Sequence, residues 1–412
     1  MMMKKNLPFL IIFMLVSYCS FGQVDTTGGG KFTMSGYIDS YYLTGFNNPR
    51  SGNFMGAGQD AGGAPVGRAF DRLDKQFALG LVQTKFMYTN AKSEMVIDLT
   101  FGPNAELGNF GNTAGTTNLY VPKRTYQSQL YGTSAAIKQA YFTYKFTDKF
   151  SMTAGQFGTH IGYEVIDAPI NYHYSLSNLF NNGPFYHVGL KATYAFSGNV
   201  TLMAGIVNNW DNLTDTKTQK SLISQLYIKP VDGWNIYLNW IGGYSDDTYL
   251  SNPVSSTATG VDPIFLTNYS RNLFDLTTGY QITPKFYLGL NAAYGWYKFN
   301  TKDAAGQDQL KARFEKTSPA WGGIAGYVNY AFTDMVGLGV RYEHFEDKHA
   351  VRYIGTVNNS LTITAPITLA AGKLIVKPEF RHDTSTDKYY EDKDGNGTNS
   401  QNTLGVAFIY KY

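Results

Sequence analysis

The last segment of the chain alternates without a break between apolar residues and small or polar ones. Its apolar face carries Leu404, Val406, Phe408 and Tyr410, and the final residue is again aromatic, Tyr412. Successive side chains of a β-strand point to opposite faces, so this pattern predicts a strand with one apolar face. An open strand edge leaves backbone groups unpaired, and in lipid only a closed barrel pairs all of them. The pattern therefore predicts an all-β protein, a transmembrane antiparallel up-and-down β-barrel.

The N-terminal segment has the composition of a secretory signal. Lys4 and Lys5 form a basic region, an apolar run follows over 7–16, and Ser20 and Gly22 have the spacing of a cleavage site. The apolar run is too short to span a bilayer as a helix. We therefore expect two parts, a cleaved signal peptide, 1–22, and a single barrel domain, 23–412.

Cysteine content and charge narrow the class further. The one cysteine, Cys19, lies within the predicted signal, and the alternative of a lipid anchor there conflicts with Tyr18, where a small residue is required. The formal charge is +3, and Lys4 and Lys5 supply two of these charges. The exported domain is thus nearly neutral, which gives no electrostatic reason to expect a nucleic-acid partner.

Short and long polar connections follow one another along the chain. Tight turns rich in Gly, Asn, Asp and Pro fall at 89–92, 147–149, 197–199, 231–233, 283–285, 333–334 and 371–373. Long connections fall near 45–72, 103–133, 159–183, 209–219, 245–270, 299–316, 348–358 and 385–400. Seven short turns and eight long loops separate about sixteen strands, the even number typical of barrels with short periplasmic turns and long extracellular loops.

Two strands are the least regular. The alternation shifts near Val82 within the strand expected at 73–89, and Pro366 interrupts the strand expected at 359–370. Proline cannot donate to a strand ladder, so it marks an edge or a bulge. We expect irregular pairing at both places.

The two faces of the expected strands differ. The outer face carries aromatic residues near strand ends, typical of a membrane interface, although a soluble β-sandwich could also bury them. The inner face carries Asp39, Glu94, Asp98, Lys145, Lys191, Asp275, Arg341, Glu343, Lys377, Glu379, Arg381 and Asp383. Such charges are costly in lipid, and sixteen strands enclose room for water. We therefore expect a hydrated lumen of mixed charge in which most of these groups form ion pairs.

The third long loop, 159–183, differs from the others because it contains many apolar residues, such as Ile161, Ile166 and Leu179. A loop of this composition packs against something, either the barrel interior or the outer rim. Inward folding would narrow the pore. The expected constriction residues are therefore Glu164 and Asp167 on the loop and Lys191, Arg341, Glu379 and Arg381 on the wall, acting as charged rings act in pores.

Residues 139–212 carry a resemblance to a known family. The segments AGQFGTHIGYEVI, FYHVGLKATY and VNNWDN, together with the early GYIDSYY, are similar to the OmpL-like β-barrel porins of Bacteroidetes outer membranes. This resemblance implies an outer-membrane porin-like barrel and no particular solute.

The sequence also contains weak signals of metal binding and of catalysis. Asp392, Asp394 and Asn396 resemble the start of a calcium loop, but Thr403 stands where the last ligand would be glutamate, so a solvated acidic loop is favoured. The six histidines lie in no nucleophile–base motif, so we expect no enzyme and no cofactor. A non-conducting barrel that acts as a surface adhesin or a structural protein remains the alternative.

The sequence thus predicts a porin, a water-filled channel for the passive diffusion of small hydrophilic solutes or ions. The expected partners are outer-membrane lipid, the transported solutes and the barrel-assembly machinery, which would recognise the C-terminal strand. Association into homo-oligomers stays open.

Overall fold

A computed structural model describes most of the chain as one closed sheet. The described residues are 29–52, 68, 70–109, 136–213, 220–245, 248–250, 264–266, 269–299, 319–348, 352 and 354–412. The predicted signal peptide 1–22 lies outside them.

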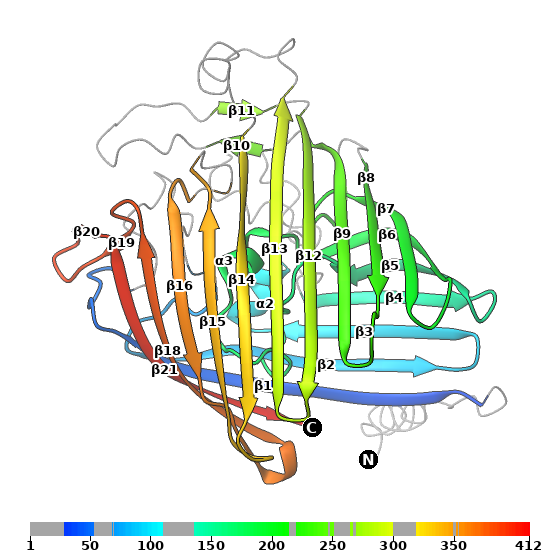
Figure 1. Ribbon diagram of the computed structural model, residues 1–412, viewed down its shortest axis with the longest axis horizontal. Helices are drawn as coiled ribbons and strands as arrows, with labels where there is room; N and C mark the ends of the chain where they lie inside the picture. The colour runs from blue at the N-terminus through cyan, green and yellow to red at the C-terminus, as the bar shows by residue number, and fades with distance from the viewer. Residues whose placement is uncertain are drawn as a thin grey trace, which may run out of the picture.

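Sixteen antiparallel strands form a closed barrel (Figure 1). They are β1 Lys31–Gly45, β2 Gln76–Thr89, β3 Ser93–Phe101, β4 Ile137–Lys145, β5 Phe150–Gly158, β6 Tyr186–Ala195, β7 Val200–Asn208, β8 Lys220–Ile228, β9 Trp234–Ser245, β12 Tyr269–Thr283, β13 Phe286–Phe299, β14 Ala320–Ala331, β15 Gly337–Glu346, β16 Val357–Thr364 with its continuation β17 Ile367–Leu369, β18 Leu374–Ser385 and β21 Ser400–Lys411. Each strand pairs with its neighbours in sequence, and β1 pairs with both β2 and β21. The C-terminal strand therefore closes the barrel, and the predicted fold class is confirmed.

The seven short turns fall where the sequence predicted them. They connect the strand pairs through residues 90–92, 146–149, 196–199, 229–233, 284–285, 332–336 and 370–373. Residues 159–185 and 386–399 form described connections at the other ends of the strands.

Both irregular strands behave as their sequences indicated. The pairing of β1 with β2 shifts between Ile38 and Ser40, where Ile38 lies opposite Val82 and Ser40 opposite Leu79. The one additional residue on β2 forms a bulge, in which a strand bends and twists more strongly. Pro366 separates β16 from β17, because it has no backbone N–H to donate.

Small elements complete the described fold. They are the helices α2 Pro103–Gly108 and α3 Asn178–Asn182, the 3₁₀ turn η4 Ala370–Gly372, and the short hairpins of β10 Thr248–Leu250 with β11 Ile264–Leu266 and of β19 Tyr390–Glu391 with β20 Gly397–Thr398. None of the helices in the described part of the chain is long and apolar enough to cross a membrane.

The well-packed core lies inside the barrel rather than around it. Phe274 and Tyr294 point outward and are more than half exposed, whereas their strand neighbours Leu273 and Ile241 are fully buried. Ile241 lies opposite Leu273 and both belong to the larger buried apolar cluster, with Phe345. The outer face is thus apolar and exposed, as expected of a barrel that sits in lipid, and the inner face is buried because a loop fills part of the lumen.

Candidate constriction site

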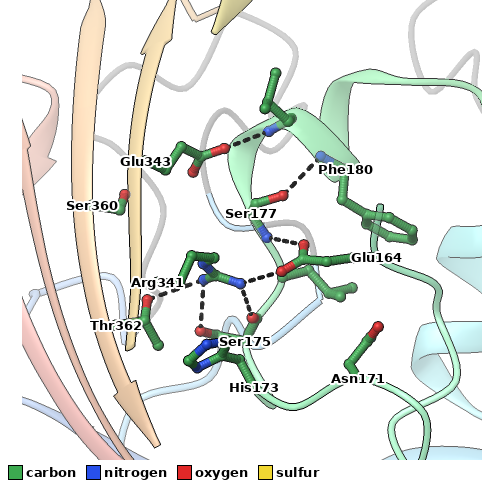
Figure 2. A network of polar contacts seen from close by, with 12 residues as sticks. Glu164, Asn171, His173, Ser175, Ser177, Phe180, Arg341, Glu343, Ser360 and Thr362 are labelled. Atoms are coloured by element: carbon green, nitrogen blue, oxygen red, sulfur yellow. Dashed lines mark hydrogen bonds and ion pairs between the residues drawn. The ribbon is translucent and has the colours of Figure 1, made fainter. Parts of the chain in front are cut away.

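The loop 159–183, between β5 and β6, lies against the inner wall of the barrel. It contacts side chains from strands far apart around the sheet, including Asp275 on β12, Arg341 on β15, Glu379 on β18 and Asp39 on β1. Figure 2 shows its segment from Glu164 to Phe180 facing Arg341 and Glu343. The geometry agrees with inward folding of this loop.

Arg341 is the centre of the largest set of contacts. Its guanidinium is fully buried and lies 2.5 Å from the Glu164 carboxylate. It also donates to the Ser175 carbonyl at 2.7 Å and to the Thr362 hydroxyl at 3.0 Å (Figure 2). Glu164 in turn accepts a hydrogen bond from the Ser177 N–H at 2.7 Å. A charged pair of this kind is tolerated in the interior when further hydrogen bonds satisfy its other groups, and here the two terminal nitrogens of Arg341 make these bonds while its buried Nε makes none.

Other charged groups of the wall hold the main chain of the loop. Glu343 accepts hydrogen bonds from the N–H groups of Asn178 and Leu179, both at 2.8 Å. These groups begin α3, whose first turn has N–H donors without helical partners. Ser177 caps the same turn through the Phe180 N–H at 3.1 Å.

The same arrangement recurs on β18. Glu379 accepts from the N–H groups of Tyr174 at 2.7 Å and Ser175 at 3.0 Å. Arg381 donates to the Leu176 carbonyl at 2.8 Å, and Lys377 donates to the Ala168 carbonyl at 2.7 Å. Charge-assisted bonds of this kind are about twice as strong as neutral ones. The wall of β15 and β18 therefore fixes residues 168–179.

The loop also reaches the opposite side of the lumen. The Asp167 carboxylate pairs with Lys138 of β4 and accepts from the Gln83 amide at 2.8 Å. Near the start of the loop, the Gly162 N–H donates to Asp275 at 3.0 Å. The loop is thus attached at both sides of the lumen.

Two tyrosine side chains of the loop pack against glycine residues of the barrel wall. A Cβ at Gly289 would come within 2.4 Å of the Tyr163 hydroxyl, and one at Gly339 within 2.3 Å of the Tyr172 ring. Such distances do not occur between real atoms, so the absence of a side chain at these positions makes room for the loop.

The loop histidines are held neutral. Burial lowers the pKa of His160 to about 4, although its Nε2 lies 3.0 Å from the Trp240 carbonyl. Burial, reinforced by the positive charges of Arg341, Lys377 and Arg381, lowers the pKa of His173 well below its usual value. The Thr364 hydroxyl donates to Glu379, so it accepts from Nδ1 of His173 at 2.7 Å, which sets the tautomer.

The structure places the six predicted constriction residues in two groups. Glu164 meets Arg341, and Asp167, Glu379 and Arg381 bind elsewhere along the loop, so five of them form contacts between loop and wall. Lys191 on β6 stands apart, with its Nζ 4.3 Å from the centroid of the Phe157 ring.

The predicted constriction residues did not include Glu343, Lys377, His173 and Asn178, which also hold the loop in place. Glu343 and Lys377 continue the alternating charged faces of Arg341 and of Glu379, and this pattern could have identified them. No local pattern marks His173 or Asn178, because their partners are far away in the sequence.

The Asp392 segment forms the turn between β19 and β20. The Asp392 carboxylate accepts from the backbone N–H groups of Asp394 at 2.9 Å and Asn396 at 2.8 Å, and these bonds lower its pKa. This is the role of an acidic turn residue. In the part of the chain that the structure describes, no group of three or more His, Cys, Asp or Glu side chains is placed to hold a metal ion.

Comparisons with known proteins place the chain among porins. The family described as "Putative beta-barrel porin-2, OmpL-like" matches residues 31–412. The fold is similar to OmpT of Vibrio cholerae (TM-score 0.54, 11% identity, 95% of this chain and 100% of that one) and to the outer membrane channel DcaP of Acinetobacter baumannii (0.55, 11%, 94% and 99%). It is also similar to Salmonella typhi OmpF (0.50, 10%, 94% and 99%). No curated protein sequence matches this chain.

Proposed function

Because the chain belongs to the OmpL-like family of outer-membrane β-barrel porins, we propose that loop 159–183 forms the constriction of a water-filled channel for small hydrophilic solutes or ions. One observation carries this proposal: the loop is attached to opposite sides of a closed barrel, through Arg341 on β15 and Lys138 on β4. A loop held in this way narrows the lumen and sets the field that a solute meets. No step of the proposal needs bond chemistry, so the protein acts as a channel and not as an enzyme.

The residues have different roles in this proposal. On the wall, Arg341, Glu379 and Arg381 position the loop: Arg341 pairs with Glu164, and the other two bind loop backbone groups. Asp167 of the loop pairs with Lys138 on the other side of the lumen. Lys191 is the member of the predicted set that is left to face the solute.

We also propose how the chain is exported and assembled. A signal peptide over 1–22 would direct export, the mature domain would begin at Gln23, and β21 would be recognised by the barrel-assembly machinery. The sequence resemblance supports an origin in Bacteroidetes. The porin-like architecture is compatible with homo-oligomers.

Conductance tests the proposed function directly. The refolded mature chain is added to a planar bilayer, and heat modifiability on a gel confirms in parallel that the barrel is folded. Stable conductance steps are expected. A folded barrel that never conducts would contradict the channel and favour the adhesin or structural alternative.

A further inference from the structure

On one half of the lumen wall the charged side chains bind the loop, and on the other half some of them do not. Around the barrel, β6 lies eight strands from β16 in either direction, so the two strands face each other across the lumen. The strands that flank β16 are β15 and β18, which hold the loop. The wall around β6 is therefore the side farthest from the contacts on β15 and β18, although the start of the loop also contacts β8 and β9 through His160.

On the side of β15 and β18, the charged side chains of the lumen wall bind the loop. Arg341, Glu343, Lys377, Glu379 and Arg381 are each at most 6% exposed, and each contacts the loop. Asp383 pairs with Arg381 at 2.7 Å. These groups are not positioned to meet a passing ion, because loop atoms cover them.

On the opposite side, six consecutive strands contain no carboxylate. No Asp or Glu occurs within β4, β5, β6, β7, β8 or β9. Their inner face carries Lys138, which pairs with Asp167, and also Lys145 and Lys191. Lys145 is exposed and Lys191 is half-buried. The fixed charge of this wall is thus positive.

Lys191 lies on the inner face of β6 between two small neighbours. Its neighbours across the ladder are Thr153 on β5 and Gly205 on β7, both small. Among the described residues its ammonium makes no hydrogen bond or ion pair, and it lies over the Phe157 ring. A ring stabilises the cation without neutralising its charge.

The nearest acidic group on this wall is Glu94 of β3. Glu94 is opposite Thr143, Thr143 is opposite Thr153, and Thr153 is opposite Lys191. Three strand spacings separate their backbones by about 14 Å, and no ion pair joins the two side chains among the described residues, although the Glu94 charge still acts on Lys191. The loop carboxylates do not compensate for Lys191 either, because Glu164 is paired with Arg341 and Asp167 with Lys138.

We propose that the solute path follows the β4–β9 wall and that Lys191 makes it selective for small anions, such as inorganic anions and small carboxylates or phosphate esters. This inference rests on the proposed channel function and deepens it. A fixed positive charge raises the local concentration of anions and lowers that of cations. At about 6 Å in water, one unit charge changes the concentration of a monovalent ion by about threefold at low salt.

The first test measures reversal potentials in a potassium chloride gradient at low salt. The wild type is expected to pass chloride in preference to potassium. Lys191→Gln should lower that preference by about tenfold, because the effects on anion and cation multiply, and Lys191→Glu should reverse it. Lys149→Gln, in the exposed turn after β4, serves as the matched lysine control and should leave the preference unchanged. The effect should shrink as salt is raised, because salt screens the charge.

The second test uses thiol labelling to find which part of the lumen wall is accessible to water. The predicted mature chain contains no cysteine, so a single introduced thiol can be followed. Thr193→Cys, two residues from Lys191 on the same face, should react faster with an anionic sulfonate reagent than with a trimethylammonium reagent. Adding Lys191→Gln should lower that rate ratio by about tenfold, since the two rates change in opposite directions. Ser360→Cys on β16, which is 1% exposed beneath the loop, should stay unlabelled.

The outcomes separate the two proposals. A folded wild type without conductance overturns the channel and, with it, this inference. Conductance with an unchanged ion preference in Lys191→Glu overturns the inference alone. Labelling of Ser360→Cys as fast as Thr193→Cys would likewise contradict a path confined to the β4–β9 wall.

Discussion

Replacing Arg341 with methionine should release the constriction loop while leaving the barrel intact. The guanidinium contacts the Glu164 carboxylate, the Ser175 carbonyl and the Thr362 hydroxyl, all within 3.0 Å. Methionine fills a similar volume and offers none of these donors. The strand ladder on either side of residue 341 uses backbone groups only, so it does not depend on this side chain.

The free-energy cost of this substitution follows from the buried Glu164 carboxylate, which loses its partner. Glu164 is 6% exposed, and in the variant its carboxylate keeps the Ser177 N–H but loses its counter-charge. Removing one partner of a buried ion pair costs about 3–5 kcal/mol. Since about 1.4 kcal/mol corresponds to a tenfold change in an equilibrium, local opening of the loop should become more frequent by about two to three and a half orders of magnitude.

Amide hydrogen exchange measures this opening. The N–H groups of Ser177, Asn178, Leu179 and Phe180 all donate to acceptors within or near the loop and should be protected in the wild type. Arg341→Met should remove most of that protection, and Arg341→Met with Glu164→Gln should restore part of it because no charge is left unpaired. Unchanged exchange over 177–180 in the single variant would refute the view that this ion pair holds the loop.

Two further predictions concern the same loop. The docked His160 ring takes up a proton only near pH 4, whereas the free imidazole does so near 6.5. Docking should therefore weaken as pH falls from about 6.5 towards 4, and His160 contributes up to about 1.4 kcal/mol per pH unit. Amide exchange of the loop should depend less on pH in His160→Gln than in the wild type, and buried His173 accounts for the dependence that remains. Gly339→Val should displace the Tyr172 ring and destabilise docking by about 1–3 kcal/mol, which limited proteolysis of the loop would detect, whereas Gly326→Val, where a Cβ meets nothing within 4 Å, should not.

The strand pattern was readable from the sequence because it depends on local rules. Alternating side chains and turn residues predicted the sixteen strands and the seven short turns, and they indicated the irregularities at Val82 and Pro366. A one-residue shift in register would move a whole apolar face into water, so each strand specifies its own orientation.

The partners of the charged side chains on the inner face come from parts of the chain that are far apart in sequence. Sequence alone determined that Lys191, Arg341 and Arg381 share the inner face, since each occupies the corresponding position of an alternating strand. Only the tertiary structure decided that Arg341 meets a loop residue 177 positions away while Lys191, on the opposite wall, meets an aromatic ring. The physical reason is that alternation fixes the face on which a side chain lies, whereas barrel closure and the course of the loop fix which groups meet across the lumen.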